Sequence, residues 1–160
     1  MEIRAAGDAD LAACRARLEE YQRGLGVSLC FQGFDRELAQ LPGDFAPPRG
    51  GLWVAVAGDD PAGCVALRPL EAGVAELKRL FVRPVYRGHQ LGHRLAAHAL
   101  AAAGHAGYRE VRLDTLPQMA AAQRLYESLG FRDCAAYNDN PVSGVRFMAL
   151  ALTAVRPRGW

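Results

Sequence analysis

The spacing of apolar residues predicts two helices in the first quarter of the chain. In residues 8–25 apolar side chains recur every three to four positions, the period of one helix face, and Asp8 is placed to cap the first turn. A short strand is expected before this helix at 2–6, and a second helix at 34–41. The stretch 42–50 is rich in proline and glycine but too short to separate domains, so we expect a loop there.

The rest of the chain predicts a sheet interrupted by two helices. Three apolar runs joined by short turns predict an antiparallel meander at 51–57, 62–67 and 74–82. They are followed by a helix that begins after Gly88 and ends near 104–107, a strand at 108–113, a helix at 119–129 and strands at 131–136 and 145–152. A right-handed crossover through the first of these helices would make its flanking strands parallel. The order predicts a mixed α/β fold, with one domain over 1–155 and a tail at 156–160.

The composition is that of an ordinary globular domain and excludes several kinds of function. Hydrophobic residues make up 51% and charged residues 22%, and the net charge of +2 is too small to indicate a nucleic-acid partner. The four cysteines are scattered without a Cys-x-x-Cys pair, which supports neither a metal site nor a redox site. The charged N-terminus differs from a signal peptide, and no apolar run is long enough to span a membrane. A cytoplasmic protein with reduced thiols is therefore expected.

Basic residues gather where a predicted strand gives way to a helix. The apolar run ends at Leu80–Val82, Pro84 stops it, and a turn containing Gly88 and Gly92 follows. Small residues let backbone N–H groups approach a ligand, and the N-terminus of a helix attracts negative charge. The turn therefore predicts an anion site, most simply for phosphate. Neither a Walker loop nor the glycine spacing of a dinucleotide-binding fold is present.

Two motifs resemble those of the GNAT superfamily of acyl-CoA-dependent N-acetyltransferases. Arg87-x-x-Gln90-x-Gly92 is similar to its motif A, Gln/Arg-x-x-Gly-x-Gly/Ala, and Leu125–Phe131 is similar to its motif B, Leu-Tyr-x-x-x-Gly-Phe. The resemblance extends over nearly the whole chain. Two positions depart from the pattern, because Gln90 stands where the family usually has Gly and Met119 where an Asn often precedes the helix.

The resemblance implies a mixed, mostly antiparallel sheet that is flanked by helices and splayed at the strand that contacts acetyl-CoA. Pantetheine would lie along this strand and the pyrophosphate on the turn. The implied cofactor residues are Leu80, Phe81, Val82, Arg87, Gly88, His89, Gln90, Leu91, Gly92 and His93. Transfer would be direct, in a ternary complex and without a metal. His89 and His93 have the spacing of two metal ligands on a helix, but no acidic or Cys partner shares that face.

Acetyl transfer to an amine needs groups that move protons. Tyr126 matches the motif B tyrosine, taken in the family as the general acid that protonates the CoA sulfur; the alternative is a tyrosine whose ring packs in the core. Glu76 lies just upstream of the implied cofactor strand, where many relatives place the base. Alternation puts Glu76 and Lys78 on one strand face, so a plain ion pair is the alternative. Asp114, after the next strand, is the substitute candidate.

The acceptor is expected to be a small amine, selected by elements around the two motifs. Phe31 and Phe34 near the second helix, together with Tyr137 and Asp139 near the closing strands, offer aromatic walls and a carboxylate. These suit a compact cationic or amino-acid-like ligand. Core packing is the alternative for both phenylalanines. A non-catalytic acyl-CoA-binding module and a protein N-terminal or lysine acetyltransferase stay open as alternatives, and so does a homodimer.

Overall fold

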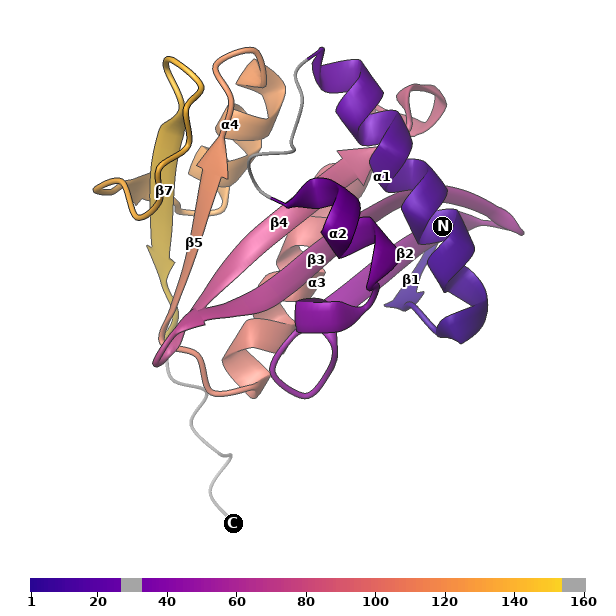
Figure 1. The fold of residues 1–160 in the computed structure, drawn as a ribbon, viewed down its shortest axis with the longest axis horizontal. Coiled ribbons are helices and arrows are strands. Elements are labelled where there is room, and N and C mark those ends of the chain that lie inside the picture. Colours follow the sequence, from indigo (N-terminus) through magenta and orange to yellow (C-terminus); the bar gives the residue numbers. More distant parts are fainter. Residues whose placement is uncertain (27–32, 154–160) are drawn as a thin grey trace.

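Seven strands form one mixed sheet with helices on both faces in the computed structural model, which describes residues 1–26 and 33–153 (Figure 1). The strands are β1 (Glu2–Ala5), β2 (Gly51–Ala57), β3 (Asp60–Glu71), β4 (Val74–Val82), β5 (Glu110–Thr115), β6 (Arg132–Asp133) and β7 (Arg146–Ala151), in the spatial order β1-β2-β3-β4-β5-β7-β6. The helices are α1 (Leu11–Leu25), α2 (Phe34–Ala39), α3 (Leu91–His105) and α4 (Ala120–Ser128). Strands β4 and β5 are parallel, and the other pairs in the described residues are antiparallel. The predicted mixed α/β fold is confirmed.

Most elements lie close to their predicted positions, and three differ for physical reasons. Strand β3 is longer than predicted because its ladders with β2 and β4 continue through both of its prolines. Residues 8–10 form a 3₁₀ turn in place of the first helical turn, because Asp10, and not Asp8, accepts the Gly7 N–H at 2.8 Å and pairs with Arg4. Strand β6 is only Arg132–Asp133, since the chain then leaves the sheet. In the described residues no helix combines the length and apolarity needed to cross a membrane.

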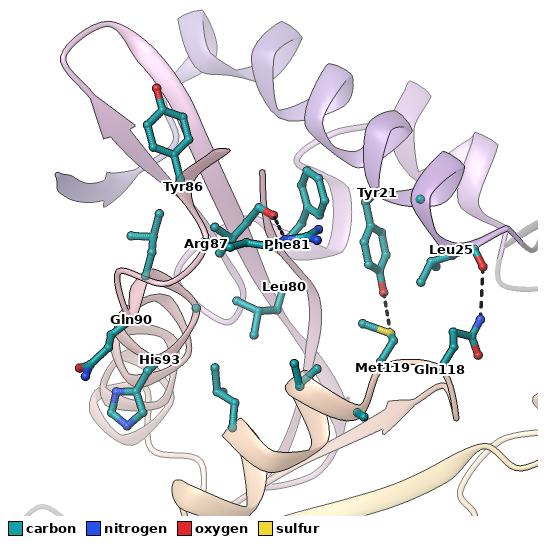
Figure 2. Close-up of a pocket in the computed structure, with 18 of the residues that line it drawn as sticks. Tyr21, Leu25, Leu80, Phe81, Tyr86, Arg87, Gln90, His93, Gln118 and Met119 are labelled. Atoms are coloured by element: carbon teal, nitrogen blue, oxygen red, sulfur yellow. Dashed lines mark hydrogen bonds between the residues drawn. The ribbon is translucent and has the colours of Figure 1, made fainter. Parts of the chain in front are cut away.

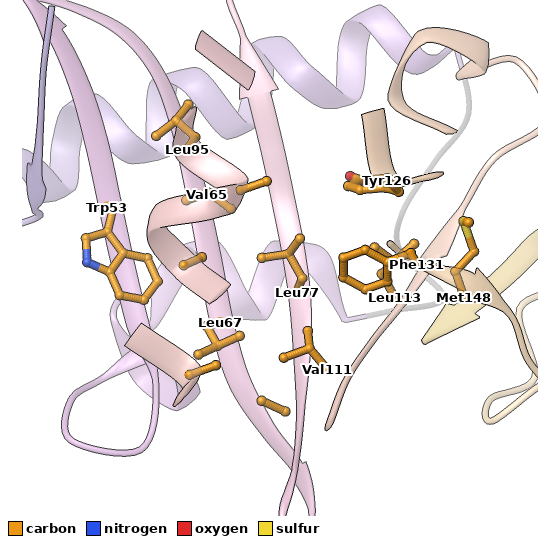
Figure 3. Packing of buried hydrophobic residues seen from close by; sticks show 14 of the residues in the cluster. Trp53, Val65, Leu67, Leu77, Leu95, Val111, Leu113, Tyr126, Phe131 and Met148 are labelled. Atoms are coloured by element: carbon orange, nitrogen blue, oxygen red, sulfur yellow. The ribbon is translucent and has the colours of Figure 1, made fainter. Parts of the chain in front are cut away.

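The sheet separates two hydrophobic cores. Helix α3 covers one face, where its Leu95 belongs to the same buried cluster as Val65 of β3 and Leu77 of β4 (Figure 3). Helices α1 and α2 cover the other face and contribute the buried Cys14, Leu18, Phe34 and Leu38. Each fully buried Leu or Phe contributes roughly 1.5–3 kcal/mol relative to an exposed one, so the two cores hold the sheet rigid between the helix layers.

Strands β4 and β5 pair over a short stretch and then separate. Val74, Ala75 and Glu76 pair with Glu110, Val111 and Arg112, and the described residues beyond them make no further β4–β5 pair. Figure 1 shows the two strands diverging from this point, with α4 beside the wider end. The backbone N–H and C=O groups on this side of the second half of β4 therefore lack a neighbouring strand.

A bulge at Arg79 accompanies the separation. The pairing of β3 with β4 shifts here, because Cys64 lies opposite Phe81 whereas Ala66 lies opposite Lys78, and Arg79 adopts a left-handed φ of 59°. A bulge bends its strand and increases the local twist, which turns the second half of β4 away from β5. The Arg79 side chain is 3% exposed, and its Nε donates to Glu37 of α2 at 2.8 Å.

The Arg79–Glu37 pair gives a test of how the bulge is held. Replacing Glu37 by Ala leaves the Arg79 charge buried without its carboxylate, so the free energy of unfolding should fall by about 3 kcal/mol. Urea denaturation measures the change. Asp133→Ala is the matched control, because the Asp133–Arg146 pair is exposed and should matter far less. Equal losses in the two variants would contradict a stabilising role for the buried pair.

Candidate active site

The separation of β4 from β5 leaves an elongated cavity of about 760 Å³ (Figure 2). Its walls come from the C-terminal end of α1, the second half of β4, the first turn of α3 and the N-terminal half of α4. The lining is predominantly apolar, and the volume falls in the range of small-molecule sites. Gln118 Nε2 donates to the Leu25 carbonyl at 3.3 Å, which links α4 to α1 across one end of the cavity.

Most of the cofactor residues implied by the motifs are brought together here. Those that line the cavity are Leu80, Phe81, Val82, Arg87, Gln90, Leu91, Gly92 and His93. The other two, Gly88 and His89, lie in the turn before α3, outside the lining, and both are exposed. The eight residues therefore share one cavity, and their contact with a cofactor stays a prediction.

The first turn of α3 presents backbone donors to this cavity. The intrahelical bonding begins with Arg94 N donating to Gln90 O at 3.0 Å, so the N–H groups of the three preceding residues have no acceptor within the helix. Gln90 has a φ of 56°, the left-handed conformation that glycine favours, which explains why the family usually has Gly there. A Cβ on Gly92 would lie 3.2 Å from Leu125 Cδ1, so this glycine permits close packing of α3 on α4. Donors, a helix N-terminus and Arg87 together fit a phosphate group.

A smaller, more polar cavity adjoins the first. It is lined by Lys78, Arg79, Asp114, Thr115, Tyr126 and Asn140, among others, and shares Tyr21, Leu80 and Met119 with the large cavity. The buried Thr115 Oγ1 makes no hydrogen bond within the described residues. A buried hydroxyl without a partner is uncommon, so this cavity offers a polar group that a bound molecule could satisfy.

Tyr126 packs in the core and also borders the polar cavity, and its role as general acid stays a prediction. Its ring packs in the core, edge to face with Phe131 at a centroid distance of 5.7 Å, and it also lines the polar cavity. Burial, with smaller effects of Tyr21 and Asp114, raises the pKa of Tyr126. The hydroxyl therefore stays protonated near neutral pH and can serve as a proton donor.

Glu76 lies at the last β4–β5 pair, and both of its carboxylate oxygens accept hydrogen bonds. Its side chain is 1% exposed; Oε1 accepts from Arg68 Nε at 2.8 Å and Oε2 from the Tyr137 hydroxyl at 2.5 Å. Lys78 Nζ lies 3.7 Å from Oε1. Burial lowers the pKa of Lys78 against the opposing effect of Glu76, whereas burial and Glu76 together raise the pKa of Tyr137. The predicted ion pair with Lys78 is present, and Glu76 lines neither cavity.

Asp114, the substitute candidate, lines the polar cavity itself. One of its oxygens accepts from Asn138 Nδ2 at 2.9 Å and from Asn140 Nδ2 at 3.3 Å. These partners could not be predicted from the sequence, since nothing in a loop sequence indicates which distant strand it will contact. Asp139 lies between the two asparagines and is exposed.

The remaining predicted residues lie elsewhere. Phe34 is fully buried in the core beneath the Arg79 guanidinium, 4.9 Å from its ring, and lines none of the cavities found in the described residues. Phe31 and the tail 156–160 lie outside the described residues. Residues 1–26 and 33–153 contain no group of three or more His, Cys, Asp or Glu arranged to hold a metal ion.

Comparison with known proteins agrees with this geometry. The model of the Acetyltransferase (GNAT) family matches residues 15–131. An uncharacterized N-acetyltransferase of Schizosaccharomyces pombe is 38% identical over 146 residues, 90% of each chain. N-acetylaspartate synthetase of Mus musculus is 36% identical over 100 residues, 62% of this chain and 33% of the synthetase.

Solved structures show the same fold. A GNAT-family acetyltransferase of Staphylococcus aureus superposes with a TM-score of 0.81 at 18% identity, over 95% of this chain and 99% of the other. The acetyltransferase yncA of Salmonella typhimurium, solved with its cofactor acetyl-CoA, superposes with a TM-score of 0.66 at 23% identity, over 95% and 94% of the chains. Since the family model spans most of the sequence and a relative matches along 90% of it, this chain belongs to the GNAT family of N-acetyltransferases.

Proposed function

We propose that this chain transfers an acetyl group from acetyl-CoA directly to the amine of a small molecule, in a ternary complex. The observation that carries the proposal is the continuity of three features. The donor-rich turn of α3, the unpaired edge of β4 and the polar cavity with Tyr126 follow one another along a single opening in the sheet.

Acetyl-CoA would lie in the large cavity. Its pyrophosphate would accept from the N–H groups at the start of α3, and Gly88 and His89 would border it on the solvent side. Pantetheine would pair with the main chain at Leu80–Val82, where β4 lacks a neighbouring strand, as an added strand does at a sheet edge. The yncA protein, which has the same fold, was solved with acetyl-CoA, and this supports the placement.

The chemistry would take place at the polar cavity. The amine attacks the thioester carbonyl, a carboxylate takes its proton, and Tyr126 protonates the departing CoA sulfur. Two carboxylates are candidates for the base. Asp114 lines the cavity, whereas Glu76 reaches it only through neighbours, because Arg68 and Tyr137 already occupy its two oxygens. In this arrangement Asp114 would accept the proton directly, whereas Glu76, which lines neither cavity, would need a relay.

The acceptor would be compact and amino-acid-like. The wall of the polar cavity carries both signs of charge, from Asp114 on one strand and Lys78 on the other. An acceptor with an amine and a carboxylate would complement both charges, with only its reacting amine inside this cavity of about 30 Å³. The similarity to N-acetylaspartate synthetase, whose name denotes an acetylated amino acid, supports the same class of acceptor. Tyr137 and Asp139 would border the entrance, and Phe34 would act on the acceptor only through Arg79.

The function is tested by release of free CoA thiol from acetyl-CoA in the presence of single amines. Amino acids, simple amines, polyamines and peptides with a free N-terminus form the panel. The proposal expects the largest kcat/KM with a small amino acid. A peptide that proves the far better acceptor would replace the small-molecule assignment by a protein acetyltransferase.

Cofactor binding is predicted to depend on Gly92. In the wild type the melting temperature should rise with acetyl-CoA concentration, because a ligand of the folded state stabilises it. Gly92→Asp should abolish this rise, since it places a carboxylate where the pyrophosphate would bind and crowds Leu125. Gln90→Gly is the matched control in the same turn and should keep the full rise, because glycine accepts the left-handed φ of 56° without strain. A folded Gly92→Asp variant that responds to acetyl-CoA like the wild type would refute this site.

Proton transfer is predicted to depend on Tyr126 and on one carboxylate. Tyr126→Phe keeps the ring packed on Phe131 and removes the donor, so kcat should fall by roughly 10²–10⁴-fold with little change in acetyl-CoA affinity. Glu76→Gln and Asp114→Asn should differ in their pH–rate profiles, because only loss of the base removes the fall in rate toward low pH. Unchanged turnover in the Tyr126 variant would leave this tyrosine a packing role alone.

Acceptor selection is predicted to depend on the loop after β6. Tyr137→Ala and Asp139→Asn should each raise KM for the amine and leave KM for acetyl-CoA unchanged, since both residues lie outside the large cavity. Steady-state kinetics with each substrate varied in turn makes the measurement. A change confined to the acetyl-CoA constant would show that this loop acts on the cofactor.

A further inference from the structure

The two cavities meet at three residues from three different elements. Tyr21 of α1, Leu80 of β4 and Met119 beside α4 line both the large cavity and the polar one. Under the function proposed above, the donor occupies the large cavity, and the reacting amine of the acceptor enters the polar one, which at about 30 Å³ has room for one such group. Because the reacting carbon and nitrogen must come within bonding distance, the acetyl group would lie at this junction.

Tyr21 places a hydroxyl at the junction. Figure 2 shows its ring descending from α1 with the oxygen directed toward Met119, and the ring packs on Phe81 at a centroid distance of 5.8 Å. The hydroxyl lies 4.0 Å from the Met119 sulfur, which is a weak acceptor. The hydroxyl can therefore donate its hydrogen bond instead to a stronger acceptor that enters the junction. Burial raises the pKa of Tyr21 to about 12, so the hydroxyl keeps its proton near neutral pH.

The reaction develops negative charge at two atoms, and two tyrosines are near. Tyr126 approaches from α4 and Tyr21 from α1, and the presence of Tyr21 contributes to the raised pKa of Tyr126. We propose that Tyr21 donates a hydrogen bond to the carbonyl oxygen of the bound thioester, while Tyr126 protonates the departing sulfur. Tyr21 lies in α1, outside both sequence motifs.

The two donors would act at successive moments. The amine lone pair forms the C–N bond, and the π pair of the carbonyl moves onto the oxygen, where the Tyr21 hydroxyl stabilises it. When that pair returns, the C–S bond breaks, and the sulfur takes the proton of Tyr126. The amine gives one proton to the carboxylate of the site, and proton transfer from that carboxylate restores Tyr126. No oxidant or further reactant is required.

The proposal is tested by binding of two CoA analogues that differ at the carbonyl. One is the ketone in which CH₂ replaces the sulfur of acetyl-CoA, and the other is S-ethyl-CoA, which has no carbonyl. Tyr21→Phe should lower the affinity for the ketone analogue by about three- to tenfold, the usual effect of losing one hydrogen bond. It should change the affinity for S-ethyl-CoA less than twofold. With acetyl-CoA and an acceptor, kcat should fall by about 10²-fold.

Tyr108→Phe is the matched control, because it removes a tyrosine hydroxyl that donates to the Arg49 carbonyl at 2.7 Å, outside both cavities. This variant should bind both analogues like the wild type, and melting temperatures confirm that both variants fold. The role of Tyr21 would be overturned if Tyr21→Phe weakened binding of the two analogues equally, if it weakened neither, or if Tyr108→Phe caused the same loss. Failure of both analogues to bind the wild type would instead overturn the proposed function, and this inference with it.

Discussion

The site depends on a single structural constraint, the bulge that Arg79 makes in β4. A charged residue in a left-handed conformation inside a buried strand is unfavourable by itself, and it persists here because Glu37 and the Phe34 ring hold the guanidinium on the α2 side of the sheet. The bulge leaves the β3–β4 ladder intact beyond it while β4 turns away from β5. One ion pair between a strand and a short helix thus lies at the bulge where β4 and β5 separate.

Opening the sheet creates both an apolar slot and a set of polar groups that need partners. Glu76 occupies the last position at which β4 still pairs with β5, and its oxygens are satisfied by Arg68 and Tyr137. Beyond it, Asp114 depends on two asparagines from the loop before β7. These contacts join segments far apart in the sequence around one point. The rigidity that catalysis requires comes from these hydrogen bonds and from the two cores on either side of the sheet.

The order of elements and the wall of the large cavity could be predicted because both follow from local patterns. Apolar periodicity located β2 and β4 to the residue, and the glycines and basic residues of the turn indicated the start of α3. The ends of β3 and β6 were wrong, since they depend on pairing partners that the local sequence does not contain. The burial of Phe34 depends likewise on Arg79, which in the sequence is only one arginine among several in a basic stretch.

The same distinction explains why the family can be identified while the acceptor stays a proposal. The turn before α3 and the edge of β4 present main-chain groups, so the backbone conformation there restricts which residue types can occur. Gln90 stands where the family usually has glycine, and the helix N-terminus still faces the cavity. The polar cavity is built from side chains on β4, β5, α1, α4 and the loop before β7. Each can change without disturbing the backbone of the cofactor cavity. A protein of this fold can therefore keep its donor site and alter its acceptor, and Tyr21, which lies outside both motifs, belongs to the side-chain wall that is free to vary.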